Sequence, residues 1–389
     1  MPLEANRNLT QRGEKEKKIL RLRFAPLRMT AGCGALQEKK VVLIMQKLVF
    51  LLAAALLLNA APVPGTEELP VSAECAVLMG PDGSVLWAKE EDRRCLIAST
   101  TKLMTALVTL EHSKLSDTVE IPAAACGIEG SSLYLQAGDR YTVEQLLLGL
   151  LLASGNDAAQ ALALHCAGDE AVFVRWMNEK AAALGMADSH FANPHGLDDD
   201  GHYGTAADLG KLMAACMAVP ELSAILGREY AVIGEQSYVN HNKLLQRCPG
   251  CLGGKTGYTR AAGRCLVSCC EREGTRLFCV TLNAPDDWND HMALYDWGFR
   301  HYVRKSVTGR LGYTLPLYGG EKGQIRVRAD ALELFLPKDA VLTLRVELPP
   351  FVLSPVRAGE SCGRVTVLRE GEILGSAALR FAEGSEKDT

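Results

Sequence analysis

The chain has 389 residues, of which 48% are apolar and 23% charged, a composition typical of a globular protein with two or three domains. The formal charge of −4 hides an asymmetry, because residues 1–61 carry 11 of the 42 basic residues and only 4 of the 46 acidic ones. The remainder is clearly acidic. Since nucleic-acid-binding proteins need a basic surface, we expect no nucleic-acid partner.

An export signal is predicted near the N-terminus. Three lysines (39, 40 and 47) precede the run LVFLLAAALLLNAAPVPG, whose apolar centre, residues 48–58, is 11 residues long. A membrane-spanning helix needs about 20 apolar residues, so a secretory signal beginning at Met45 is favoured over an uncleaved anchor. We predict that residues 1–44 are a non-functional upstream extension, 45–61 a signal peptide and 62–70 a linker. The mature protein is expected to be extracytoplasmic, in the cell wall or at the outer face of the cytoplasmic membrane.

Twelve of the 13 cysteines follow the predicted signal. Export would favour disulfides, yet Cys126, Cys166 and Cys216 lie in apolar helical contexts, where a free thiol acts as a small buried hydrophobe. The pair Cys248 and Cys251 in CPGC is compatible with a disulfide, half of a metal site or two free thiols. No second C-x-x-C supplies the remaining ligands of a structural zinc site, so no metal is predicted.

Strand-like segments flank a helical middle. Residues 73–90 indicate two strands joined by the turn PDGS, and short strands return between residues 229 and 283. Helical periodicity fills residues 115–220, and a further helix is expected over 288–301. We therefore predict an α/β lobe built from two separated stretches, with an all-helical lobe inserted between them and a ligand cleft between the lobes. Beyond residue 304 a period of 2 indicates a separate small β domain.

The segment IASTTKLMTALVTL, residues 97–110, is predicted to be a helix with one apolar face. Residues three apart lie on the same side of a helix, so Ser99 and Lys102 project together at its first turn. Burial and the positive end of the helix dipole both favour the neutral form of the lysine, and a neutral amine beside a hydroxyl is a general base. Alternatively, Ser99 caps the helix and Lys102 is a solvated first-turn residue.

Two further motifs favour the catalytic interpretation. ASGND places S-G-N at residues 154–156 between two helices, and GGKTGYTRAAG places K-T-G at residues 255–257 at the start of a strand. The glycines there permit close approach of the backbone to a ligand. Taken singly, the first is also compatible with an inter-helix turn and the second with a loop before a strand. S-x-x-K, S-x-N and K-T-G in this order are the signature of penicillin-binding proteins and serine β-lactamases.

Longer stretches resemble the low-molecular-mass D-alanyl-D-alanine carboxypeptidases within that group. They are NPHGLDDDGHYGTAADL (193–209), KTGYTRAAGRCLV (255–267) and YDWGF (295–299). A class A β-lactamase would carry a glutamate-containing loop where this chain has NPHGLD. The resemblance implies a penicillin-binding-protein/β-lactamase-like transpeptidase fold of the α/β class, an antiparallel sheet with helices plus the inserted helical lobe. It implies a catalytic domain over residues 71–304 and a β-rich C-terminal domain over 305–383.

The resemblance also assigns the groups that carry the reaction. By it, Ser99 is the nucleophile that attacks the carbonyl between two D-alanines, and Lys102 accepts its proton. Ser154 passes a proton towards the leaving amine, and Asn156 holds the peptide oxygen of the substrate.

The resemblance assigns substrate binding to the K-T-G motif. By the same resemblance, Lys255 adds positive potential near the substrate carboxylate and Thr256 hydrogen-bonds it, with Gly257 completing K-T-G. The backbone N–H groups of Ser99 and Tyr258 form the oxyanion hole, which stabilises the transition state by about 3 kcal/mol per donor. No metal or organic cofactor is needed.

The implied protein is a serine-type carboxypeptidase that removes the terminal D-alanine from peptidoglycan stem peptides, with β-lactams as acylating inhibitors. A DD-endopeptidase or a β-lactamase would use the same groups. A catalytically idle cell-wall-binding protein is an alternative of a different class, although every motif residue is intact.

Some positions depart from the family pattern. Gly204 stands where Ser or Thr is usual, which we interpret as a local capping change. The loop NAPDDWNDH lacks the arginine with which relatives bind the terminal carboxylate, and Arg260 is a geometric guess for that role. His195 is interpreted as a brace for its loop rather than a cleft residue. The ending FAEGSEKDT has no apolar face, so no amphipathic C-terminal anchor is expected, while membrane association stays open.

Overall fold

The computed structural model describes residues 69–385. The predicted upstream extension, the predicted signal peptide and most of the predicted linker lie outside the described residues. All strands and helices described here lie within residues 69–385.

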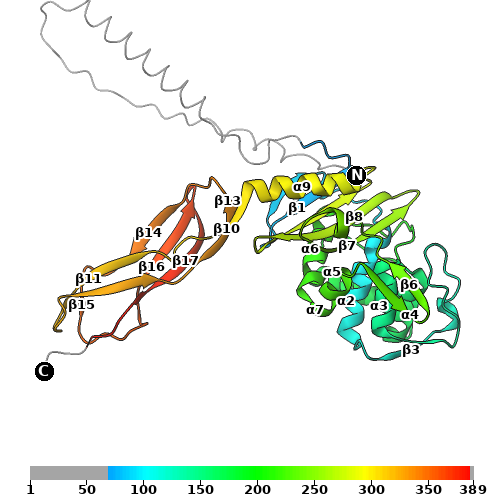
Figure 1. The fold of residues 1–389 in the computed structure, drawn as a ribbon, viewed down its shortest axis with the longest axis horizontal. Coiled ribbons are helices and arrows are strands. Elements are labelled where there is room, and N and C mark those ends of the chain that lie inside the picture. The colour runs from blue at the N-terminus through cyan, green and yellow to red at the C-terminus, as the bar shows by residue number, and fades with distance from the viewer. Residues whose placement is uncertain (1–68, 386–389) are drawn as a thin grey trace, which may run out of the picture. The chain divides into compact units, whose positions relative to one another are not determined.

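A five-stranded antiparallel sheet is the scaffold of the first part of the described chain. Its strand order is β2-β1-β9-β8-β7 (Figure 1). The strands are β1 (Cys75–Met79), β2 (Val85–Lys89), β7 (Cys251–Thr259), β8 (Gly263–Arg272) and β9 (Thr275–Leu282). Because β1 pairs with both β2 and β9, two stretches far apart in the sequence form one sheet, as predicted. K-T-G lies within β7 rather than at the start of a strand, since pairing with β8 extends β7 back to Cys251.

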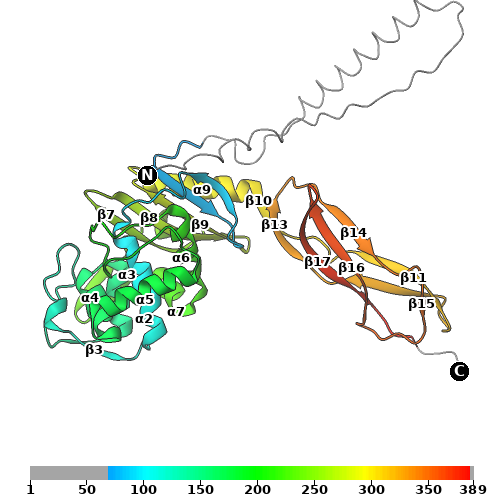
Figure 2. The same cartoon turned by 180° about the vertical axis from the view of Figure 1, so that it is seen from behind.

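Helices cover both faces of this sheet. Helix α6 (Ala206–Ala218) packs against one face and α9 (Asp287–His301) against the other, as both views show (Figures 1 and 2). Successive strand residues point to opposite faces, so Val267 joins the core on the α6 side and Leu266 joins the core under α9. The near-continuous apolar sequence of β8 follows from this double burial.

The helical lobe lies between β2 and β7 in the chain. Its helices are η1 (Ala98–Thr101), α2 (Lys102–His112), η2 (Ala123–Ala125), α3 (Val143–Leu152), α4 (Asn156–Ala167), α5 (Glu170–Ala183), α6, α7 (Pro220–Leu226) and α8 (Leu244–Arg247). Thr142 begins α3 with a capping box shared with Gln145. The sequence did not indicate the short pair β3 (Thr118–Glu120) and β4 (Arg140–Thr142) inside this lobe. A hairpin of β5 (Tyr230–Ile233) and β6 (Gln236–Val239) precedes β7.

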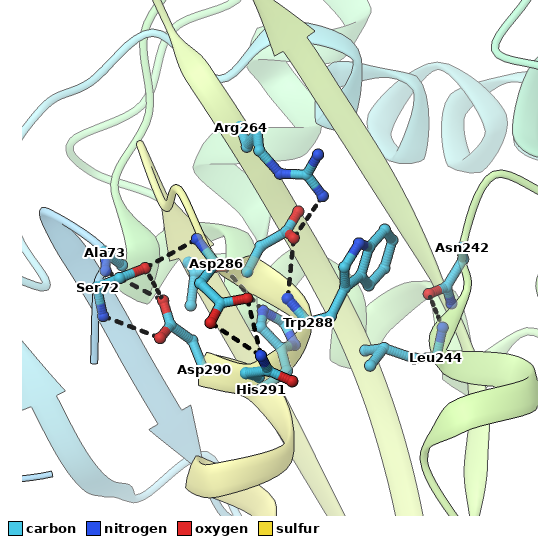
Figure 3. A network of polar contacts seen from close by, with 12 residues as sticks. Ser72, Ala73, Asn242, Leu244, Arg264, Asp286, Trp288, Asp290 and His291 are labelled. Atoms are coloured by element: carbon cyan, nitrogen blue, oxygen red, sulfur yellow. Dashed lines mark hydrogen bonds and ion pairs between the residues drawn. The ribbon is translucent and has the colours of Figure 1, made fainter. Parts of the chain in front are cut away.

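A buried polar network fixes the N-terminal end of α9 (Figure 3). The carboxylate of Asp290 accepts hydrogen bonds from the backbone N–H and hydroxyl of Ser72 and from the N–H of Ala73. His291 lies between the hydroxyls of Ser268 and Thr281, at 2.7 and 3.0 Å, and its burial lowers its pKa to about 3. Each of these buried side chains therefore has hydrogen-bond partners, and the network joins the segment before β1 to α9.

The rest of the described chain is all β, as predicted. Its strands are β10 (Tyr302–Ser306), β11 (Gly312–Tyr318), β12 (Gln324–Ala329), β13 (Glu333–Pro337), β14 (Thr343–Glu347), β15 (Val352–Leu353), β16 (Ser361–Arg369) and β17 (Glu372–Phe381). Six of them form a sheet of order β14-β16-β17-β12-β11-β15, and β10 pairs with β13. Alternate residues such as Leu315, Leu317, Ile325 and Val327 form its own core.

The twelve cysteines from Cys75 to Cys362 are free thiols. Cys248 and Cys251 are therefore not joined in a disulfide. Within residues 69–385, no group of three or more His, Cys, Asp or Glu side chains is placed to hold a metal ion. Cys216 is fully buried as predicted, but Cys126 and Cys166 are only half-buried. The reason is their position, since Cys126 ends a 3-10 turn and Cys166 lies in the last turn of α4.

In the part of the chain that the structure describes, no single helix is long and apolar enough to cross a membrane. Helices α6 and α7 reach that length and composition together, but they are bent by 107° at their junction. Both contribute buried side chains to the core of the helical lobe.

Candidate active site

Ser99 lies in the 3-10 turn η1, which leads directly into α2. Ala98, the residue before it, has a φ of +46°, a region that residues with a side chain rarely adopt. Neither η1 nor α2 has a side-chain cap, and the Ser99 hydroxyl lies 2.7 Å from Lys102 Nζ instead. The interpretation of Ser99 as a helix cap is therefore wrong.

Lys102 is fully buried and makes three polar contacts. Its Nζ lies 2.7 Å from Ser99 Oγ, 2.7 Å from Asn156 Oδ1 and 2.6 Å from the carbonyl oxygen of His195. In its neutral form the amine has two N–H donors and one lone pair. With the two donors engaged by the amide oxygen of Asn156 and the carbonyl oxygen of His195, the lone pair of that form points toward Ser99. Burial, and then the charge of Lys255, hold the pKa of Lys102 well below its ordinary value. The solvated first-turn interpretation is wrong, because Lys102 is fully buried beside the Ser99 hydroxyl.

Ser154 and Asn156 lie where α3 gives way to α4. Ser154 has a φ of +65° and its side chain borders the cleft. Asn156 begins α4, and its amide spans from Lys102 to the carbonyl of Glu129, to which Nδ2 donates. Both ends of the amide are engaged inside the protein, so its contact with a substrate oxygen stays a prediction.

Asp157 holds the loop beside Asn156. Its buried carboxylate accepts hydrogen bonds from the backbone N–H groups of Leu133 and Leu135 and from the hydroxyl of Ser132. In the same loop, the backbone carbonyl of Ser131 accepts a hydrogen bond from the backbone N–H of Asn156. The loop and the amide next to Lys102 are thus fixed by one set of bonds, which the S-x-N motif alone did not indicate.

K-T-G lies on the edge strand β7, directly beside η1, the turn that carries Ser99. Lys255 is buried, its Nζ donates to the carbonyl of Thr256 at 2.7 Å, and burial lowers its pKa to about 7. A Cβ on Gly257 would lie 3.0 Å from the backbone nitrogen of Ser99, so glycine lets the strand run close to the turn. Tyr258 exposes 68% of its surface and lines the cleft.

These motifs border one open cleft of about 840 Å³. Ser99, Ser154 and residues 256–258 line it, while Lys102, Asn156 and Lys255 lie buried behind them. The structure therefore brings all three motifs together. Further lining residues that sequence reasoning missed are Ser131, Ala153, Ser237, Tyr238, Val239, Asn240, His241, Lys243, Arg264, Asp287 and Trp288.

Arg264 is the most informative of the missed residues. It stands opposite Tyr258 in the β7–β8 register, donates from Nη2 to the carboxylate of Asp287 at 2.6 Å, and lies over the ring of Trp288 (Figure 3). Its Nε is buried without a hydrogen-bond partner among the described residues. Burial raises the pKa of Asp287. Arg260, the sequence-based guess, is exposed in the β7–β8 turn and is not among the cleft residues.

The segment 193–204 packs on η1 from the other side. The backbone of His195 contacts Lys102, its ring Nδ1 accepts from the N–H of Leu197, and the ring does not line the cleft. These contacts agree with the bracing interpretation. The cap of α6 is Thr205, whereas Gly204 exchanges backbone hydrogen bonds with Cys95, so the capping interpretation of Gly204 is wrong.

Comparison with known proteins identifies the family. A sequence profile of D-alanyl-D-alanine carboxypeptidases matches residues 63–286, more than half of the chain. The chain belongs to this family.

The family relationship extends over the β region in several relatives. D-alanyl-D-alanine carboxypeptidase DacC of Escherichia coli is 31% identical over 346 residues, 83% of this chain and 86% of that protein. DacB2 of Mycobacterium tuberculosis is 41% identical over 237 residues, 58% of this chain and 81% of that protein. Penicillin binding protein 5 from Haemophilus influenzae has a similar structure, with a TM-score of 0.65 and 28% identity over 83% of this chain and 100% of that one.

These matches confirm the predicted family, the transpeptidase-like fold with its all-β C-terminal region, and the assignment as a serine D-Ala-D-Ala carboxypeptidase. They also connect this carboxypeptidase to peptidoglycan and to penicillin binding. The assignment of individual residues to steps of the reaction belongs to the proposal that follows.

Proposed function

We propose that this carboxypeptidase removes the terminal D-alanine from peptidoglycan stem peptides through an acyl-enzyme on Ser99. The observation that carries the proposal is the 2.7 Å contact between Ser99 Oγ and the fully buried Nζ of Lys102. As Oγ attacks the carbonyl carbon, its proton passes to Lys102. The C–N bond then breaks, the proton passes by way of Ser154 to the leaving amine, and D-alanine departs. Water hydrolyses the acyl ester and restores the Ser99 hydroxyl.

Stabilisation of the developing oxyanion is assigned to the backbone N–H groups of Ser99 and Tyr258. Support comes from the close approach of β7 to η1 at Gly257, which puts the two backbones side by side. Donors of this kind act on charge that develops only in the transition state, each worth about 3 kcal/mol. A β-lactam would acylate the same serine and leave slowly.

Recognition of the terminal carboxylate is assigned to Thr256, to the charged form of Lys255 and to Arg264. Arg264 is a cleft cation held in place by Asp287 and Trp288, and a guanidinium suits bidentate pairing with a carboxylate. The carboxylate-binding role that the sequence analysis assigned to Arg260 is therefore assigned to Arg264.

Replacement of Arg264 by alanine is expected to raise KM for a stem pentapeptide by about tenfold, equivalent to about 1.4 kcal/mol, with a smaller effect on kcat. The reason is that the substrate carboxylate is bound in both the ground state and the transition state. Steady-state kinetics of D-alanine release measure the effect, and Arg260→Ala is the matched control. An unchanged KM in Arg264→Ala, or an equal rise in Arg260→Ala, contradicts the assignment.

The proposal includes the location and the domain division. The apolar run at residues 48–58 supports export of the protein to the site of peptidoglycan, with the catalytic domain over residues 71–304 and the β-rich domain over 305–383. N-terminal sequencing of the mature protein tests the predicted removal of residues before position 62.

The decisive experiment incubates the protein from residue 62 onward with a fluorescent penicillin. We expect one covalently labelled species, and we expect Ser99→Ala to abolish the label because no other nucleophile replaces the hydroxyl. Mass spectrometry of the products from stem pentapeptide, cross-linked dimer and penicillin then separates a carboxypeptidase from an endopeptidase or a β-lactamase. Absence of Ser99-dependent labelling would rule out the acyl-enzyme mechanism and favour a catalytically idle binding protein.

A further inference from the structure

A chain of hydrogen bonds runs from His202 to the backbone immediately before the nucleophile. The hydroxyl of Thr101 lies 2.7 Å from the carbonyl oxygen of Ala98 and 2.7 Å from Nε2 of His202. All three residues are buried, with at most 2% of their surface exposed. None of them lines the cleft, so the chain acts from behind the site.

The direction of each hydrogen bond follows from the donors available. Nδ1 of His202 faces the backbone N–H of Ala192 at 3.1 Å, so Nδ1 is the acceptor and Nε2 carries the proton. The single proton of the Thr101 hydroxyl goes to the carbonyl of Ala98, because that oxygen can only accept. His202 Nε2–H therefore donates to Thr101, and Thr101 donates to Ala98, with the imidazole neutral. Burial lowers the pKa of His202 to about 4, which agrees with the neutral form at pH 7.

The carbonyl at the end of this chain belongs to a strained residue. Ala98 holds a φ of +46° without the freedom of a glycine, so the surrounding contacts must maintain its conformation. The backbone of Gly196 lies in close contact with the Ala98 carbonyl. A Cβ at position 196 would lie 2.0 Å from the Ala98 oxygen, so only glycine fits there. The Ala98 carbonyl and the Ser99 N–H belong to the same planar peptide unit, so a rotation of this peptide would move that N–H and shift the Ser99 hydroxyl with it.

The same loop also holds the base. The carbonyl of His195 accepts from Lys102 Nζ, and the carbonyl of Pro194 accepts from the hydroxyl of Thr105 on α2. The segment 193–204 thus contacts η1 through Gly196 and His202, and contacts the lysine through His195.

We propose that His202 is a positioning residue that acts through Thr101 on the Ala98 carbonyl and so sets the orientation of Ser99. The inference rests on the proposed acyl-enzyme and deepens it. Its consequence is that loss of the His202 donor slows the acylation step, while the first, non-covalent binding of penicillin or peptide is little affected.

The test measures the acylation rate constant and the non-covalent dissociation constant separately, by stopped-flow fluorescence with a fluorescent penicillin. His202→Leu and Thr101→Val are expected to lower the acylation rate constant at least about tenfold, since small misplacements of reacting groups cost up to about a hundredfold. His202→Gln, whose side-chain amide can donate at the position of Nε2 and accept near Nδ1, is expected to recover most of the rate. The double variant should be no slower than the slower single variant, because both changes break one chain.

The matched control is His291→Leu. His291 is also buried, also neutral and also bonded to hydroxyls, but it lies on the α9 face of the sheet and its hydrogen bonds go to Ser268 and Thr281 rather than to η1. The His291→Leu variant should lower Tm at least as much as His202→Leu does. The acylation rate constant of the folded variant should stay within about twofold of the wild-type value.

Two outcomes would overturn the inference: wild-type acylation in His202→Leu, or a defect in His202→Gln as large as in His202→Leu. A wild-type protein that penicillin does not label at Ser99 would overturn the proposed function instead, so the two failures are distinguishable.

Discussion

Replacing Lys102 with methionine is expected to lower the rate of acylation by about a thousandfold, because the variant removes the only side chain placed to accept the Ser99 proton within residues 69–385. Stability should fall little or even rise, since methionine fills a similar volume and burying an amine is costly. Time courses of fluorescent penicillin labelling and thermal unfolding measure the two effects.

Lys102→Arg is the sharper companion variant. A guanidinium keeps the positive charge and the donors but does not lose a proton near neutral pH. If Lys102 acts as a base, the arginine variant should be as inactive as the methionine variant and less stable, because its larger charged group enters a fully buried site. Substantial acylation by Lys102→Arg would mean that the residue supplies charge rather than accepting a proton.

The pairing of Ser99 with Lys102 could be predicted because it depends only on local geometry. Residues three apart share a side of any helical turn, and the apolar neighbours of Lys102 indicated its burial. The same local reasoning failed for the cap, since Ser99 lies in a 3-10 turn whose preceding residue has a positive φ. No residue type in IAST signals that conformation, because Ala98 is not a glycine, asparagine or aspartate.

The contacts that complete the site depend on pairing between distant segments. Arg264 enters the cleft because β7 and β8 pair in a register that sets it opposite Tyr258, and Asp287 meets it because α9 begins beside that strand. Sequence reasoning missed both, although a residue six positions after Tyr258 on a returning strand could have been placed on the same face by counting alternate positions. His202 gave no such signal, since its partners come from the turn before α2 and from its own loop.

The order of the three motifs, by contrast, predicted the fold better than any single element did. Each motif requires a different element: the helical start for S-x-x-K, the junction of α3 and α4 for S-x-N and an edge strand for K-T-G. Only a fold that brings these three elements to one cleft satisfies all of them, which is why the expected sheet, inserted helices and cleft agree with the structure.

The efficiency of the enzyme on a substrate with a free carboxylate is expected to fall as pH rises above about 7. Burial lowers the pKa of Lys255 to about 7, so its ammonium is charged below that pH and neutral above it. The charged form is the one that attracts a carboxylate. On the acid side Lys102 must be neutral, and its pKa lies well below the ordinary value, so activity should be lost only at lower pH. The profile of kcat/KM in the free enzyme should therefore be bell-shaped.

A matched substrate without a free carboxylate tests whether the decline of kcat/KM above about pH 7 comes from carboxylate binding. A stem pentapeptide whose terminal carboxylate is converted to an amide gains nothing from a charged Lys255, so its lower kcat/KM should not decline near pH 7. Lys255→Arg stays charged at every accessible pH, so it should remove the decline for the carboxylate substrate, whatever its effect on the absolute rate. If both substrates decline together in the wild-type protein, the titration near pH 7 belongs to the chemical step and not to carboxylate binding. In that case Lys255 would act chiefly through the pKa of Lys102, which its charge lowers.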